Sequence, residues 1–114
     1  QKEGIPPSNI TRQILFEGGC LAPSNENVAI AQEIFEEMKR HSDKIIGKQY
    51  AMLVLSLLAV GKTDEGLDIF NEMRRKTSFV PSVSLFNQLL TSLCRDSFEK
   101  GMEFWEKTRG SFTL

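Results

Sequence analysis

The sequence repeats itself with a period of 35 residues. The segment Ile34–Arg40 (IFEEMKR) returns as Ile69–Arg75 (IFNEMRR) and, more loosely, as Phe104–Gly110 (FWEKTRG). Three small residues keep the same spacing, namely Ala31, Gly66 and Gly101. A fixed period of this length is typical of stacked supersecondary units, none of which can bury its own apolar face alone. The chain is therefore interpreted as an array of repeats.

Each unit shows the apolar spacing of two helices. In the second unit the apolar residues from Tyr50 to Leu58 fall at i, i+3, i+4, i+7 and i+8, and the third unit repeats the pattern from Phe86. A polar break at residues 61–64 precedes a second helix, and Pro81 ends the unit with Ser82 placed to cap the next helix. Each unit is thus predicted to be an antiparallel hairpin of a helix A and a helix B.

The predicted fold is an all-α solenoid of about three stacked hairpins. The first repeat, residues 5–46, is degenerate, with its helix A over residues 9–17 and a long loop over 18–24. The second covers residues 47–82 and the third, truncated, residues 83–114. Because the chain begins at Gln1 and stops inside a repeat, we expect a fragment of a longer array. The small residues at the repeat spacing are expected where helices A and B approach most closely.

Composition is that of an ordinary folded domain. The 114 residues are 40% hydrophobic and 25% charged, with a formal net charge of -1 and a sequence pI near 5.9. The chain therefore lacks the overall positive charge that would by itself indicate binding to nucleic acid. Cys20 and Cys94 stand far apart without a Cys/His cluster, which favours reduced core thiols over a metal site or a disulfide. The longest apolar run, 51–60, is too short for a membrane span.

The sequence offers no set of residues for catalysis. His41 is the single histidine and follows two cations at a predicted helix end, so we interpret it as a solvated cap. A partner set for a nucleophilic triad and a glycine-rich phosphate loop are both missing from the sequence. We therefore predict a non-catalytic protein without a cofactor or a metal.

The repeat resembles the pentatricopeptide repeat family. The resemblance rests on the early aromatic of helix A (Tyr50, Phe86), the turn glycine at 61, the acids at 64 and 65 before a small residue, the IFNEM segment and the proline at 81. It covers residues 47–114 well and 5–46 weakly. The tetratricopeptide family has a 34-residue period and a Trp-containing pattern that this chain lacks. The resemblance implies a solenoid whose A helices line a concave surface for single-stranded RNA, roughly one nucleotide per repeat.

Candidate RNA-binding residues follow from the resemblance. The family reads a base edge with the residue after the early aromatic, which is Asn87 in the third unit but Ala51 in the second, where a methyl group cannot hydrogen-bond. The last residue of a unit, here Ser82, is the second reader, and a basic residue late in helix A, here Arg95, meets the phosphate. Lys48 occupies a position where the family has an apolar clamp. The predicted site is Asn87, Arg95, Ser82 and Lys48.

Two classes of function remain open. The first is an organellar RNA-binding protein that holds single-stranded RNA in transcript processing, stability or translation, in mitochondria rather than chloroplasts. The alternative is a scaffold or subunit of a large assembly such as an organellar ribosome, with proteins as partners. The clamp position at Lys48, Ala51 and the mildly acidic balance favour the scaffold, whereas Asn87 and Arg95 favour RNA.

Overall fold

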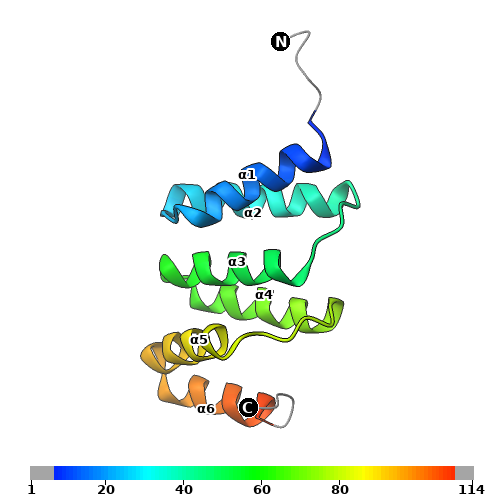
Figure 1. Ribbon diagram of the computed structural model, residues 1–114. Coiled ribbons are helices and arrows are strands. Elements are labelled where there is room, and N and C mark those ends of the chain that lie inside the picture. The colour runs from blue at the N-terminus through cyan, green and yellow to red at the C-terminus, as the bar shows by residue number, and fades with distance from the viewer. Residues whose placement is uncertain (1–6, 110–114) are drawn as a thin grey trace.

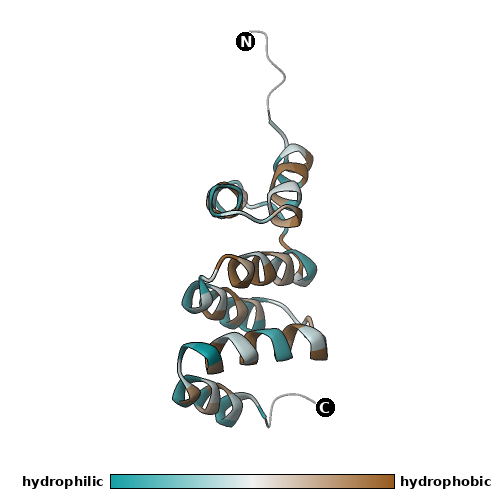
Figure 2. Ribbon diagram, turned by 90° about the vertical axis from the view of Figure 1, so that its left-hand side faces the viewer, coloured by the Kyte–Doolittle hydropathy of each residue, from teal (hydrophilic) through white to brown (hydrophobic). Residues whose placement is uncertain are grey.

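The computed structural model describes residues 7–109. Over that range the chain consists of helices joined by loops. Consecutive helices pack as three hairpins stacked one below another, as Figures 1 and 2 show. This confirms the predicted all-α array of helical hairpins. The helices are α1 (Asn9–Leu21), α2 (Asn25–Arg40), α3 (Gly47–Ala59), α4 (Thr63–Lys76), α5 (Val83–Asp96) and α6 (Phe98–Thr108).

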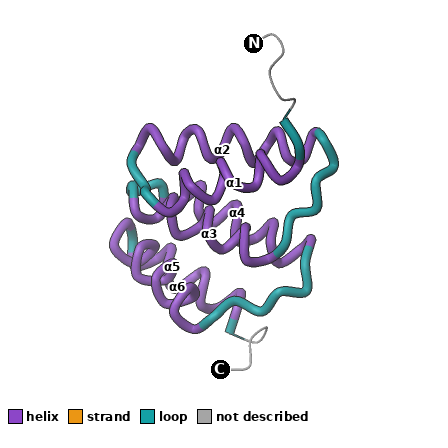
Figure 3. Tube along the Cα trace, turned by 45° about the horizontal axis from the view of Figure 1, so that its top comes forward, coloured by secondary structure: helices purple, strands orange, loops and turns teal. Residues whose placement is uncertain are grey.

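The limits of the repeats stay a prediction. Each hairpin lies within one of the segments 5–46, 47–82 and 83–114, but residues 1–6 and 110–114 lie outside the described residues. The links between hairpins, residues 41–46 and 77–82, run along the same edge of the array (Figure 3). At the second link Ser82 caps α5 as predicted, because its hydroxyl accepts a hydrogen bond from the Leu85 amide at 3.0 Å.

The array curves toward its A helices. Helix α1 contacts α3, and α3 contacts α5, with Cα atoms within 8 Å, whereas no two of α2, α4 and α6 come that close within residues 7–109. A layer of closely spaced helices beside a layer of wider spacing bends toward the closely spaced side. The exposed sides of α1, α3 and α5 therefore form the inner face of the curve, which we call the A face.

Buried aromatic rings connect the layers and the hairpins. Phe35 of α2 lies 5.4 Å from Phe16 of α1 and 5.2 Å from Tyr50 of α3, measured between ring centroids. Phe104 of α6 contacts Phe70 of α4 at 5.5 Å and Phe86 of α5 at 5.2 Å. Aromatic pairs at these separations add to the free energy gained from burial alone. The core is thus continuous from the first hairpin to the third.

The prediction of a long loop at residues 18–24 is wrong, because α1 continues through Leu21 and only residues 22–24 connect it to α2. Gly19 faces the partner helix, and a Cβ atom there would lie 3.1 Å from the carbonyl oxygen of Asn27 and 3.2 Å from the Cβ of Ala31. This glycine serves close packing rather than a turn. The same helical turn buries Cys20 in the core, as expected for a reduced thiol.

The small residues at the repeat spacing face the partner helix of their own hairpin. Ala31 is fully buried against Gly19. A Cβ at Gly66 would lie 3.2 Å from the Cδ2 of Leu58, which is the mobile end of a side chain. A Cβ at Gly101 would overlap the Sγ of Cys94 and approach its Cα and Cβ to 3.3 Å. The third hairpin therefore has the least room for an added methyl group.

We expect Gly101→Ala to lower the free energy of unfolding by about 1–2 kcal/mol, because the methyl group forces α5 and α6 apart. Gly66→Ala should be close to neutral, since Leu58 can move and alanine gains up to about 1 kcal/mol of helix propensity. Urea unfolding followed by circular dichroism measures both. If Cys94→Ala does not restore part of the loss in Gly101→Ala, the contact with the thiol is not its cause.

Candidate nucleic-acid interface

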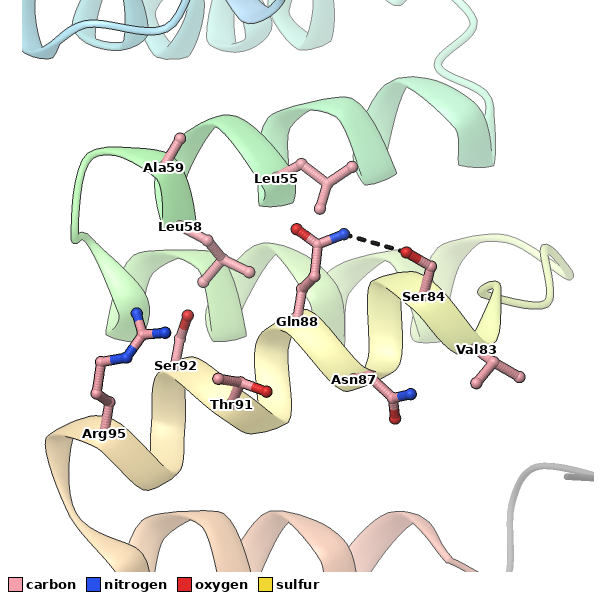
Figure 4. Close-up of a pocket in the computed structure, with 10 residues that line it drawn as sticks. All are labelled: Leu55, Leu58, Ala59, Val83, Ser84, Asn87, Gln88, Thr91, Ser92 and Arg95. Atoms are coloured by element: carbon pink, nitrogen blue, oxygen red, sulfur yellow. Dashed lines mark hydrogen bonds between the residues drawn. The ribbon is translucent and has the colours of Figure 1, made fainter.

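A groove of about 660 Å³ lies between α3 and α5 on the A face (Figure 4). Its wall on α3 is apolar, and its wall on α5 is polar apart from Val83. Within residues 7–109 none of the lining residues is acidic, and Arg95 is the only charged one. The lining consists of Leu55, Leu58, Ala59, Val83, Ser84, Asn87, Gln88, Thr91, Ser92 and Arg95.

The spacing of α5 creates the polar wall. Leu85, Phe86, Leu89 and Leu93 are buried, which fixes the rotation of the helix against its neighbours. The polar residues between them are left on the groove side at spacings of three and four, the helical neighbours of one face. An apolar stripe in the sequence thus determines where the polar side chains of the same helix point.

Two of the four predicted site residues line the groove. Asn87 and Arg95 are both exposed and both belong to the lining. In Figure 4 Arg95 points toward the α3 side, whereas Asn87 points away from α3. Ser82 caps α5 and lies outside the lining, and so does Lys48, which is exposed near the start of α3. The structure therefore brings together only Asn87 and Arg95.

Sequence reasoning missed several lining residues. Gln88 projects toward Leu55 (Figure 4), and its Nε2 donates a hydrogen bond to the Ser84 hydroxyl at 3.2 Å. Thr91 and Ser92 continue the polar wall toward Arg95. The helical spacing of these residues in the sequence could have predicted the polar wall. The apolar wall of α3 could not be predicted from the sequence, because it depends on which helix packs beside α5.

The chemistry of the A face changes along the array. On α5 its exposed residues Ser84, Gln88 and Arg95 are polar. On α1 three residues with the same spacing are apolar and exposed, namely Ile10 (58%), Ile14 (64%) and Leu21 (76%). Helix α3 is intermediate, with Lys48, Met52 and Ala59 at the equivalent places. At these three places the A face is therefore apolar on α1 and polar on α5.

Three cations on the outer layer of the array have structural partners. Arg40 pairs with Glu37 at 2.6 Å and Arg109 with Glu106 at 3.3 Å, each along its own helix. Lys100 of α6 reaches Asp64 of α4 at 3.2 Å. Their pairing indicates a structural role for Arg40, Lys100 and Arg109 rather than a path for phosphates.

A buried polar cluster joins the first two hairpins. The Tyr50 hydroxyl donates to the Glu72 carboxylate at 2.9 Å, and the Lys39 ammonium lies 2.7 Å from the same oxygen. Burial and the neighbouring carboxylate raise the pKa of Tyr50 well above its usual value. Burial raises the pKa of Glu72, but the hydrogen bonds from Lys39 and Tyr50 outweigh it, so the net pKa is lowered. These shifts keep Tyr50 protonated and Glu72 ionised near neutral pH.

Other kinds of site find no support in the part of the chain that is described. Residues 7–109 contain no group of three or more His, Cys, Asp or Glu side chains that could hold a metal ion. The two cysteines are free thiols. None of the helices in this range is long and apolar enough to cross a membrane.

Comparison with known proteins supports the family resemblance. Residues 50–77, which cover α3 from its early aromatic through α4, match the family model described as PPR repeat. A pentatricopeptide repeat-containing protein of Arabidopsis thaliana is 33% identical over 63 residues, which are 55% of this chain and 7% of that relative. The chain therefore spans a small part of the length of this relative. The resemblance to the pentatricopeptide repeat family is confirmed.

Proposed function

Because the chain carries a pentatricopeptide repeat at residues 50–77, we propose that it binds single-stranded RNA in the groove between α3 and α5. The observation that carries the proposal is the lining of that groove, which combines polar neutral side chains with one cation, Arg95, and no acid. A polyanion is repelled by carboxylates and needs a cation and hydrogen-bond donors. By contrast, the lining of the hollow beside α6 contains three acids, Glu99, Glu103 and Glu106, beside two lysines.

Asn87 and Arg95 have different roles in this proposal. They are eight residues apart on one helix, so their Cα atoms are separated by about 12 Å along the axis at 1.5 Å per residue. The Asn87 amide can donate to and accept from a base edge, and the Arg95 guanidinium can meet a phosphate. Ser82 and Lys48 would contribute from the starts of α5 and α3, outside the lining of the groove.

The biological role follows at the level of the family. We propose a non-catalytic protein of an organelle, mitochondria rather than chloroplasts, which holds a transcript during processing, stabilisation or translation. Its partners would be single-stranded RNA and other proteins of an organellar ribonucleoprotein assembly. Fluorescence of a tagged full-length protein together with an organelle marker tests the location.

Substitutions in α5 should separate the two contacts. We expect Arg95→Ala to weaken binding to every single strand and to reduce the salt slope by about one unit, since one phosphate contact is lost. Asn87→Ala should chiefly reduce preference at one nucleotide. Binding is measured by fluorescence anisotropy across a salt series with short labelled RNAs. Parent-like binding of every RNA by both variants would remove the groove as an RNA site.

A protein scaffold is the second candidate, and one observation favours it. Ile10, Ile14 and Leu21 are exposed on α1, and an exposed apolar patch commonly marks a contact with another protein. Replacing Ile14 with serine should leave RNA affinity unchanged if RNA lies in the α3–α5 groove. If the Ile14→Ser variant loses the function of the protein and the Arg95→Ala variant keeps it, the protein acts as a scaffold.

A further inference from the structure

We propose that the groove between α3 and α5 holds a nucleobase against Leu55 and Leu58, with Gln88 contacting the edge of that base. The proposal rests on the proposed RNA-binding function and assigns a base site beyond the positions expected from the family resemblance. Among those positions, Lys48 and Ala51 of α3 supply neither the apolar clamp nor a base reader, and Asn87 of α5 points away from α3. The suitable chemistry lies further along the same groove.

Leu55 and Leu58 offer the apolar surface. Both are half-buried and line the groove from α3, and Figure 4 shows their side chains directed toward α5. A nucleobase has two apolar faces. Covering one of them with aliphatic side chains removes that face and the side-chain surface from water. Ala59, the next lining residue of α3, leaves space because it carries only a methyl group.

Gln88 supplies the polar contact opposite this surface. Its side chain points toward Leu55 (Figure 4), and its Nε2 is hydrogen-bonded to the Ser84 hydroxyl at 3.2 Å. This bond uses one amide proton and orients the group, so the carbonyl oxygen and the second proton remain for a ligand. A base edge presents neighbouring donors and acceptors that an amide can meet in pairs.

Arg95 completes the site at the far end of the groove. It lies seven residues after Gln88, two helical turns or about 10 Å along α5, and it is the only charged group in the lining. A base between α3 and Gln88 therefore has a phosphate-binding cation further along the same wall. The equivalent places on α1 hold Ile14 and Leu21, so the same arrangement is not repeated there.

The test uses Gln88→Met, which inserts the residue found at the equivalent position of α3, Met52. Gln13→Met is the matched control, because Gln13 is an exposed amide of α1 outside this groove. Affinities for short oligo(A), oligo(C) and oligo(U) are measured by anisotropy for both variants and the parent. We expect Gln88→Met to reduce the ratio between the tightest and weakest of these affinities roughly tenfold, and Gln13→Met to leave the ratio unchanged.

The outcomes separate the two proposals. If the parent binds RNA, loses affinity in Arg95→Ala, but keeps its base preference in Gln88→Met, the base site is wrong and the RNA function stands. The base site is also wrong if the parent binds all three oligonucleotides equally. If the parent binds none of them, both proposals fail together. Circular dichroism and thermal unfolding of Gln88→Met confirm that the variant is folded, as its exposed position predicts.

Discussion

Replacing Phe35 with alanine should lower the free energy of unfolding by about 3–5 kcal/mol, the usual loss for a phenylalanine removed from a core. Phe35 is 1% exposed, and its ring contacts Phe16 in the first hairpin and Tyr50 in the second. The Lys39 ammonium also lies 5.0 Å from its ring centroid. The substitution opens a cavity at the junction of the two hairpins. The packing within the first hairpin and the contact between the two hairpins are therefore both weakened.

Phe98→Ala is the matched control for this prediction. The Phe98 side chain is 70% exposed at the start of α6, so its removal should change stability by no more than about 0.5 kcal/mol. Urea unfolding monitored by circular dichroism, with the slope of the transition compared between variants, measures both effects. Equal losses in the two variants would show that Phe35 does not join the hairpins.

Glu72→Ala should lower the free energy of unfolding by about 2–3 kcal/mol at neutral pH. The carboxylate of Glu72 accepts from Tyr50 and pairs with Lys39, and the Tyr50 residue is 3% exposed. Removing it leaves the buried hydroxyl without its acceptor and leaves the Lys39 ammonium with only its longer contact to Glu36, at 3.5 Å, among the pairs described, which is a costly way to break such a cluster. Tyr50→Phe, which removes only the hydroxyl, should cost about 1 kcal/mol.

The contribution of Glu72 should depend on pH with a definite sign. Its pKa in the folded protein is lowered by the hydrogen bonds from Lys39 and Tyr50, after burial has acted against them. A carboxyl group whose folded pKa is depressed stabilises the protein above its unfolded pKa, about 4.3, and loses that effect as the pH falls through the folded pKa. The difference between the parent and Glu72→Ala should therefore be constant from about pH 6 to 8 and shrink below about pH 4.

A carboxylate on the surface provides the control for the pH series. Glu106 pairs with Arg109 along α6, and its side chain is 54% exposed. An exposed pair of this kind contributes little to stability, so Glu106→Ala should follow the parent curve at every pH. If Glu72→Ala and Glu106→Ala have the same pH profile, the buried cluster does not control acid stability.

Several features of this protein could be predicted from the sequence because they depend on neighbours along the chain. The 35-residue period and the apolar spacing of Tyr50 to Leu58 identify the helices, and Ser82 identifies the start of one of them. Helical spacing also puts Asn87 and Arg95 in the lining of one groove. Each of these depends on rotation about a single helix axis, which the order of residues determines.

Only the tertiary structure decided the features that require two helices to meet. Gly18 and Gly19 suggested a loop, but the close approach of Gly19 to Ala31 keeps them in α1. The groove needs Leu55 and Leu58 opposite Gln88, and the buried cluster needs Lys39, Tyr50 and Glu72 from three helices. The distance and angle between packed helices are set by the fit of their side chains. A local pattern in the sequence does not specify that fit.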